Sequence, residues 1–114
     1  MVPGKYNIVC PQGSTYSQRF TYHIDESSVN LTTYTARMQV RETHSSDVKV
    51  FDLTTANGGI ILGGSLGTID VSISATDTAA VVAKNYVYDL ELVNGSVVTR
   101  IVEGQFIVTP EVTR

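Results

Sequence analysis

Apolar and polar residues alternate along short segments of this chain, which is the pattern of β-strands with one buried face. The clearest case is 34–41, whose inward positions are Tyr34, Ala36, Met38 and Val40. The segments 68–74 and 86–92 alternate in the same way. Gly, Asn, Asp, Ser and Thr separate the segments at short intervals. This spacing is typical of β-sandwiches and small barrels.

The same pattern predicts further strands, with lower regularity. They are expected at 5–10, 16–24, 48–53, 60–62 and 96–110. Asn94-Gly95 separates two apolar runs and is a strong signal for a tight hairpin turn. The segment 75–83 is rich in small residues and predicts one helical turn that crosses between two sheets, with Thr76 or Asp77 as its cap.

The fold predicted from these elements is all-β: an immunoglobulin-like β-sandwich of about seven to eight antiparallel strands with one short helical turn. Residues 1–114 would form a single domain, since 114 residues are enough for one core and no linker or repeat interrupts the pattern. A closed barrel is the competing architecture.

The last expected strand is apolar on both faces. Val98, Val102, Phe106 and Val108 share one parity, whereas Ile101 and Ile107 share the other. Either a bulge near Gly104 reverses the facing, or a neighbouring subunit covers the second face. The second explanation makes this strand a docking edge, with interaction residues Ile101, Gln105, Ile107 and Thr109.

Charge and hydropathy narrow the choice of partners. The net charge is −3 and the basic residues are scattered from Lys5 to Arg114, so we expect no nucleic-acid binding. No apolar run approaches the ~20 residues needed to span a bilayer, and we expect no membrane association. The first residues lack the pattern of a secretory signal, which predicts synthesis in a cytoplasm.

Candidate metal and cofactor chemistry is sparse. Cys10 is the single cysteine, which excludes an internal disulfide and a cysteine cluster. His23 and His44 are the two histidines, and a metal site needs several converging ligands. We therefore expect no metal and no cofactor.

Acidic side chains on outward strand positions allow two interpretations. Asp89 and Glu91 could form a catalytic or calcium-binding pair, or they could lie opposite Arg37 and Arg41 on a neighbouring strand. Cross-strand pairing is the favoured interpretation. The sequence contains no Ser-His-Asp spacing, nucleotide-binding glycine motif or nucleophile elbow, and we expect no enzymatic activity.

Several segments together resemble a known family. In chain order they are Gln12-Gly13, 30–41, 67–74, 86–92 and 98–113. This order resembles small tail-associated proteins of tailed bacteriophages, and is similar to the immunoglobulin-like N-terminal domain of phage baseplate upper proteins. The chain departs from that pattern at Thr33, where the family usually has Gly. It also carries no fibre or receptor-binding extension after these motifs, so the resemblance leaves open whether this chain itself contacts a receptor.

The resemblance implies a non-enzymatic virion structural protein. Such a protein would be made in the host cytoplasm and assemble in the tail or baseplate of the virion. It would dock other tail, baseplate or fibre subunits as a homo- or hetero-oligomer. One alternative is a head decoration or head-to-tail connector protein. Another is a carbohydrate-binding or adhesin module, which predicts a cluster of exposed aromatic side chains at one end of the sandwich.

Overall fold

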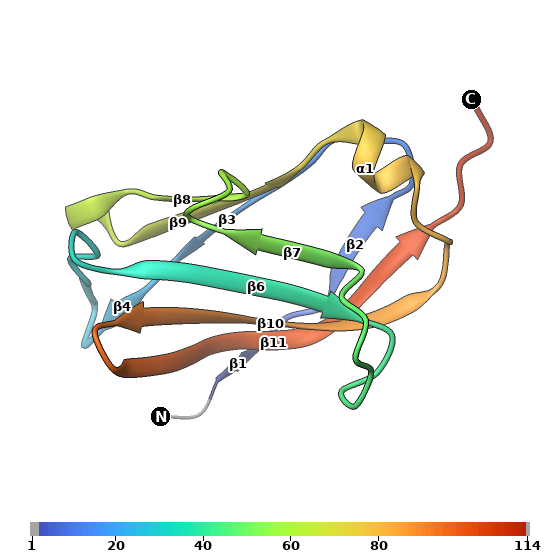
Figure 1. Ribbon diagram of the computed structural model, residues 1–114. Helices are drawn as coiled ribbons and strands as arrows, with labels where there is room; N and C mark the ends of the chain where they lie inside the picture. The colour runs from blue at the N-terminus through green and yellow to red at the C-terminus, as the bar shows by residue number, and fades with distance from the viewer. Residues whose placement is uncertain (1–2, 114) are drawn as a thin grey trace.

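The structure is a computed structural model that describes residues 3–113, and two β-sheets pack face to face in it (Figure 1). The larger sheet has the order β1-β11-β10-β6-β7, and β2 also pairs with β11. Its strands are β1 (Gly4–Lys5), β2 (Ile8–Pro11), β6 (Thr35–Arg41), β7 (Phe51–Thr54), β10 (Asn85–Asn94) and β11 (Val97–Thr109).

The smaller sheet has the order β3-β9-β8 and covers the inner face of the larger one. Its strands are β3 (Tyr16–Thr21), β8 (Ile60–Leu62) and β9 (Thr68–Ile73). A separate hairpin of β4 (His23–Ile24) and β5 (Ser27–Ser28) follows β3, and a single 3-10 turn, η1 (Gly64–Leu66), joins β8 to β9. The predicted all-β sandwich is confirmed.

Alternation along the strands builds the core, as the sequence predicts. In β6 and β10 every second side chain is buried, including Met38 and Leu90 with no exposed area. Phe106 of β11 lies at the centre of an aromatic cluster. Its ring centroid is 5.9 Å from that of Tyr16, 5.7 Å from that of Phe51 and 6.4 Å from that of Tyr88. Because Tyr16 belongs to the smaller sheet, this cluster ties the two layers together.

The predicted helical turn is present as α1 (Ala75–Ala79). Its cap is Ser74, whose hydroxyl accepts a hydrogen bond from the Asp77 N–H at 3.2 Å, so the predicted cap at Thr76 or Asp77 is wrong. Thr78 is fully buried and donates to the Ser14 carbonyl at 2.8 Å. The turn therefore fixes the connection between β2 and β3 as well as crossing between the sheets.

β11 has apolar residues at both odd and even positions because a β-bulge interrupts the strand. The pairing of β10 with β11 shifts between Leu90 opposite Val102 and Glu91 opposite Arg100, which leaves Ile101 as the extra residue. The bulge reverses the facing, so Val98 is 48% exposed whereas Val102 is buried. The predicted bulge exists, at Ile101 rather than near Gly104.

The first two strands pair in parallel with β11, whereas every other described pair is antiparallel. The contact is close at Gly104, where a Cβ would lie 2.2 Å from the Tyr6 carbonyl oxygen. The Tyr88 hydroxyl donates to the same carbonyl at 2.6 Å, and the Asn7 side chain accepts from the Gln105 N–H at 3.0 Å. These contacts carry the pairing across the gap between β1 and β2.

This pairing corrects the prediction that the last strand is a docking edge. β11 has β10 on one side and β1 and β2 on the other, so it lies inside the sheet. The edges of the larger sheet are β7 and the β1–β2 segment.

Replacing Gly104 by Ala should lower the free energy of unfolding by about 1–3 kcal/mol, because the added Cβ overpacks against the Tyr6 backbone. Gly4→Ala is the matched control. Its Cβ would meet the Ile101 carbonyl at an ordinary 3.5 Å, so the change should stay within about 0.5 kcal/mol. Urea unfolding of both variants measures the difference, and equal losses would contradict the close approach at Gly104.

Removal of two buried tyrosine hydroxyls should change the free energy of unfolding in opposite directions. The Tyr16 hydroxyl has no hydrogen-bond partner among the described residues, whereas the Tyr88 hydroxyl donates to Tyr6. Tyr16→Phe should therefore raise the free energy of unfolding by up to about 1 kcal/mol, and Tyr88→Phe should lower it by about 1 kcal/mol. Thermal unfolding monitored by circular dichroism distinguishes the two signs. A loss of stability in Tyr16→Phe would mean that its hydroxyl has a partner.

Candidate functional site

The outer face of the larger sheet carries a ladder of ion pairs that crosses its strands. Arg37 of β6 donates to the Glu91 carboxylate of β10 at 2.7 Å. Arg100 of β11 lies 3.3 Å from the Asp89 carboxylate and 4.0 Å from that of Glu91. Each charge therefore faces at least one opposite charge on a neighbouring strand.

The ladder continues to the first strand. Arg100 also lies 3.4 Å from the Glu103 carboxylate, which in turn pairs with Lys5 of β1. Three basic side chains thus balance the three acidic ones, Asp89, Glu91 and Glu103. Because these charges compensate one another, the ladder itself has little net potential for attracting a charged ligand over distance.

The loop 42–50, between β6 and β7, overhangs one end of this face beside β10 and β11 (Figure 1). Arg41 fixes the loop, because its guanidinium donates to the Ser46 carbonyl at 2.5 Å and to the Gln39 side chain at 2.9 Å. Between loop and sheet lies an open depression of about 380 Å³. Its polar lining includes Gln39, Arg41, His44, Asp89, Arg100 and Glu103.

Two carboxylates in the depression have pKa values displaced in opposite directions. Burial raises the pKa of Asp89 above its usual range, against the opposing effect of Arg100. The hydrogen bond from Lys5 lowers the pKa of Glu103, and Arg100 adds to this effect. Asp89 is therefore held in a less favourable environment for its charge than Glu103. Arg100 is already paired with carboxylates, and Arg41 is held by the Ser46 carbonyl and the Gln39 side chain, so the arrangement suits a protein contact better than capture of a small anion.

The predicted cross-strand pairs are half confirmed. Glu91 lies opposite Arg37, as expected. Asp89 lies opposite Gln39 and pairs with Arg100 instead, whereas Arg41 lies opposite Val87. The difference arises because the alternation of a strand fixes the facing of its residues but leaves the register between strands open.

The four predicted interaction residues lie in two different environments. Gln105, Ile107 and Thr109 alternate with the buried Phe106 and Val108, and so they point to the outer face near β2. Ile101, at the bulge, is partly buried and packs against the core. The structure therefore brings three of the four together and separates the fourth.

Two further residues join Ile107 on the outer face. Val9 of β2 lies directly opposite Ile107 and is 56% exposed, and Val87 of β10 is a half-buried diagonal neighbour. We call Val9, Val87 and Ile107 the outer apolar patch. Sequence reasoning missed Val9 and Val87, although their position between the buried Ile8 and Cys10, and Tyr86 and Tyr88, signals their outward facing.

Among residues 3–113, no three His, Cys, Asp or Glu side chains are arranged to hold a metal ion. His23 lies in β4 and His44 in the 42–50 loop, in different parts of the fold. The helices in this part of the chain are too short to cross a membrane.

Comparison with known proteins finds no protein-family model that matches the chain. No curated protein matches it significantly either.

Removing the charge of Asp89 or of Glu103 should change the pH dependence of stability in opposite ways. Because the pKa of Asp89 is raised in the folded protein, ionisation of Asp89 lowers the stability of the wild type as the pH rises. Because the pKa of Glu103 is lowered, the stability that its charge contributes is lost as the pH falls. Between about pH 3 and pH 6, the melting temperature of Asp89→Asn relative to wild type should rise with pH, and that of Glu103→Gln should fall. Calorimetric melts across this range measure both slopes. Slopes of the same sign would contradict the assignment.

Proposed function

We propose that this protein is a non-enzymatic virion structural protein of a tailed bacteriophage. It assembles in the tail or baseplate and docks another subunit or a fibre. The resemblance of its ordered motifs to tail-associated proteins supports the class of protein. The outer apolar patch supports the mode of action, and it is the observation that carries the proposal.

The patch has the composition of a protein interface. Val9, Val87 and Ile107 form an apolar centre, and the ion-pair ladder and the exposed Gln105 border it. Stable protein interfaces combine an apolar centre with a polar rim, and they deplete the centre of charge. Since the charges of the ladder compensate one another and Arg41 already donates to the Ser46 carbonyl and the Gln39 side chain, a partner docks here by shape and apolar contact rather than by electrostatic attraction.

The carbohydrate-binding alternative requires exposed aromatic side chains that gather at one end. Most aromatic side chains instead enter the core, namely Tyr16, Phe51, Tyr86, Tyr88 and Phe106. Tyr6 is 44% exposed, but it contacts Phe20 edge-on at the side of the sandwich. The aromatic residues of the described chain therefore favour a packing role over a sugar platform.

The location of the protein is tested by quantitative mass spectrometry of purified virus particles against the crude lysate. Enrichment at the copy number of baseplate proteins is the expected result. Abundance equal to that of the major capsid protein would assign the protein to the head instead. Absence from the particles would overturn both virion assignments.

The role of the patch is tested by Ile107→Glu, which places a charge at its centre. This variant should remain folded as an isolated domain but fall at least tenfold in its incorporation into particles. Val98→Glu is the matched control, because Val98 is exposed on the same strand beyond the bulge and its substitution should leave incorporation unchanged. Unfolding of Ile107→Glu would reveal a core role, and normal incorporation would exclude the patch as the docking surface.

A further inference from the structure

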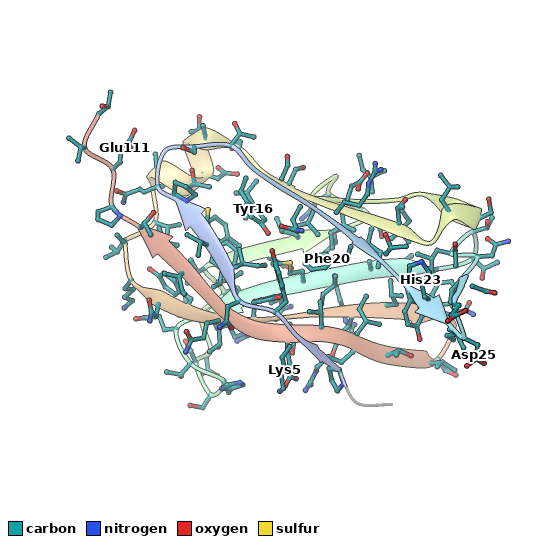
Figure 2. The ribbon with its side chains drawn as sticks, turned by 180° about the vertical axis from the view of Figure 1, so that it is seen from behind. Lys5, Tyr16, Phe20, His23, Asp25 and Glu111 are labelled. Carbon is teal, nitrogen blue, oxygen red and sulfur yellow. The ribbon has the colours of Figure 1, made fainter. Side chains whose placement is uncertain are left out.

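Within the part of the chain that the structure describes, the smaller sheet ends in a strand whose outer backbone groups have no strand beside them. Among these residues β3 pairs with β9 alone, and Figure 2 shows it along the side of the molecule near the labelled Tyr16 and Phe20. Just past its end, the Tyr22 N–H donates to the Gly67 carbonyl at 2.8 Å in the same register. Backbone groups of successive residues point alternately to the two sides of a strand. The N–H and C=O groups of Ser17, Arg19 and Thr21 therefore point outward, away from β9.

Three other edge strands, β7, β2 and β8, are shielded against pairing with another chain. On β7 the Asn57 side chain accepts from the Thr54 N–H and donates to the Asp52 carbonyl, both at 2.9 Å. β2 ends in Pro11, which has no N–H to offer, and β8 has three residues. Side-chain caps, proline and short length are the usual protections of an edge against pairing with another chain.

β3 lacks these protections over its six residues. Its one charge is Arg19, which Asp70 of β9 holds through two hydrogen bonds of 2.6 and 3.0 Å. The Gln18 side chain donates to the Arg19 carbonyl at 3.4 Å, which is long for a hydrogen bond. A backbone N–H of an added strand can replace it. A six-residue edge with its charge neutralised is able to accept a further strand.

We propose that β3 pairs in antiparallel fashion with β3 of a second copy of this chain, about a two-fold axis at Gln18. In this register Ser17 lies opposite Arg19 of the second copy, and their outward backbone groups can exchange both hydrogen bonds. Tyr16 lies opposite Phe20 of the second copy on the inner face. Aromatic cross-strand pairs of this kind stabilise sheets.

Charge selects this register over its neighbour. Moving the axis to Arg19 would set two guanidinium groups directly opposite each other, which is unfavourable. With the axis at Gln18, each Arg19–Asp70 pair faces a serine. The two smaller sheets then become one continuous six-stranded sheet. This inference stands on the smaller sheet alone and does not depend on the proposed virion role.

Sedimentation equilibrium of the wild type, Ser17→Pro and Ser17→Ala tests the pairing. Proline removes the outward Ser17 N–H but none of the hydrogen bonds between β3 and β9, whereas Ala removes the hydroxyl and keeps the N–H. Wild type and Ser17→Ala should approach twice the monomer mass of 12.4 kDa as concentration rises. Ser17→Pro should bind its copy at least tenfold more weakly, with an unchanged circular dichroism spectrum. A wild type that stays monomeric at about 1 mM, or a Ser17→Pro dimer of normal strength, would overturn the proposal.

Cross-linking tests the register even if Ser17→Pro fails to fold. Residues opposite each other at a non-hydrogen-bonded position have Cα atoms about 4.5 Å apart, within reach of a disulfide. Under mild oxidation Gln18→Cys should therefore form a covalent dimer. Thr21→Cys is the matched control and should not, because Thr21 lies opposite residue 15 of the second copy. The native Cys10 is fully buried and should stay free in both variants. Failure of Gln18→Cys to cross-link, or equal cross-linking of Thr21→Cys, would exclude this axis.

Discussion

The parallel pairing of the first strands with β11 is the constraint on which the rest of the structure depends. It requires the backbone of Tyr6 to approach Gly104 more closely than any side chain at residue 104 would allow. Hydrogen bonds of the Tyr88 hydroxyl with Tyr6 and of the Asn7 side chain with Gln105 hold the N-terminal segment against β11. The N-terminal segment could alternatively have joined the free edge of β3. Because it joins β11 instead, it completes the larger sheet, makes β11 an interior strand and leaves β3 as an edge.

The pattern of the sequence predicts what is local in this fold. Regular alternation predicts β6, β9 and β10, the Asn94-Gly95 pair predicts the hairpin between β10 and β11, and small residues predict the turn at α1. The positive φ of 62° at Gly95 explains why this pair forms so tight a turn. The pairing of the first strands with β11 cannot be predicted in this way. It joins residues 98 positions apart, and no periodicity in the sequence encodes it. The exact position of the bulge is equally hidden, because Ile101 and Gly104 explain the change of parity equally well.

The same distinction applies to the candidate site. Parity alone correctly predicts that Gln105, Ile107 and Thr109 share a face, and it misplaces Ile101 because the bulge interrupts the count. The facing of Glu91 and Arg37 toward the same side is predictable from alternation, but their pairing and the pairing of Asp89 with Arg100 of β11 depend on the register between strands, which alternation leaves open. The outer apolar patch could not be assembled from the sequence, because Val9 reaches Ile107 only through the parallel pairing of β2.

The two proposed contact surfaces are compatible because they lie on different sheets. The outer apolar patch belongs to the larger sheet, whereas β3 borders the smaller one. A two-fold contact through β3 is isologous, so each copy uses the same edge and the contact closes after two chains. What remains at the ends of the joined sheet is β8, whose three residues are too few to propagate pairing. The proposed dimer is therefore a finite unit that presents two identical outer patches, and larger assembly then depends on the partner that binds those patches.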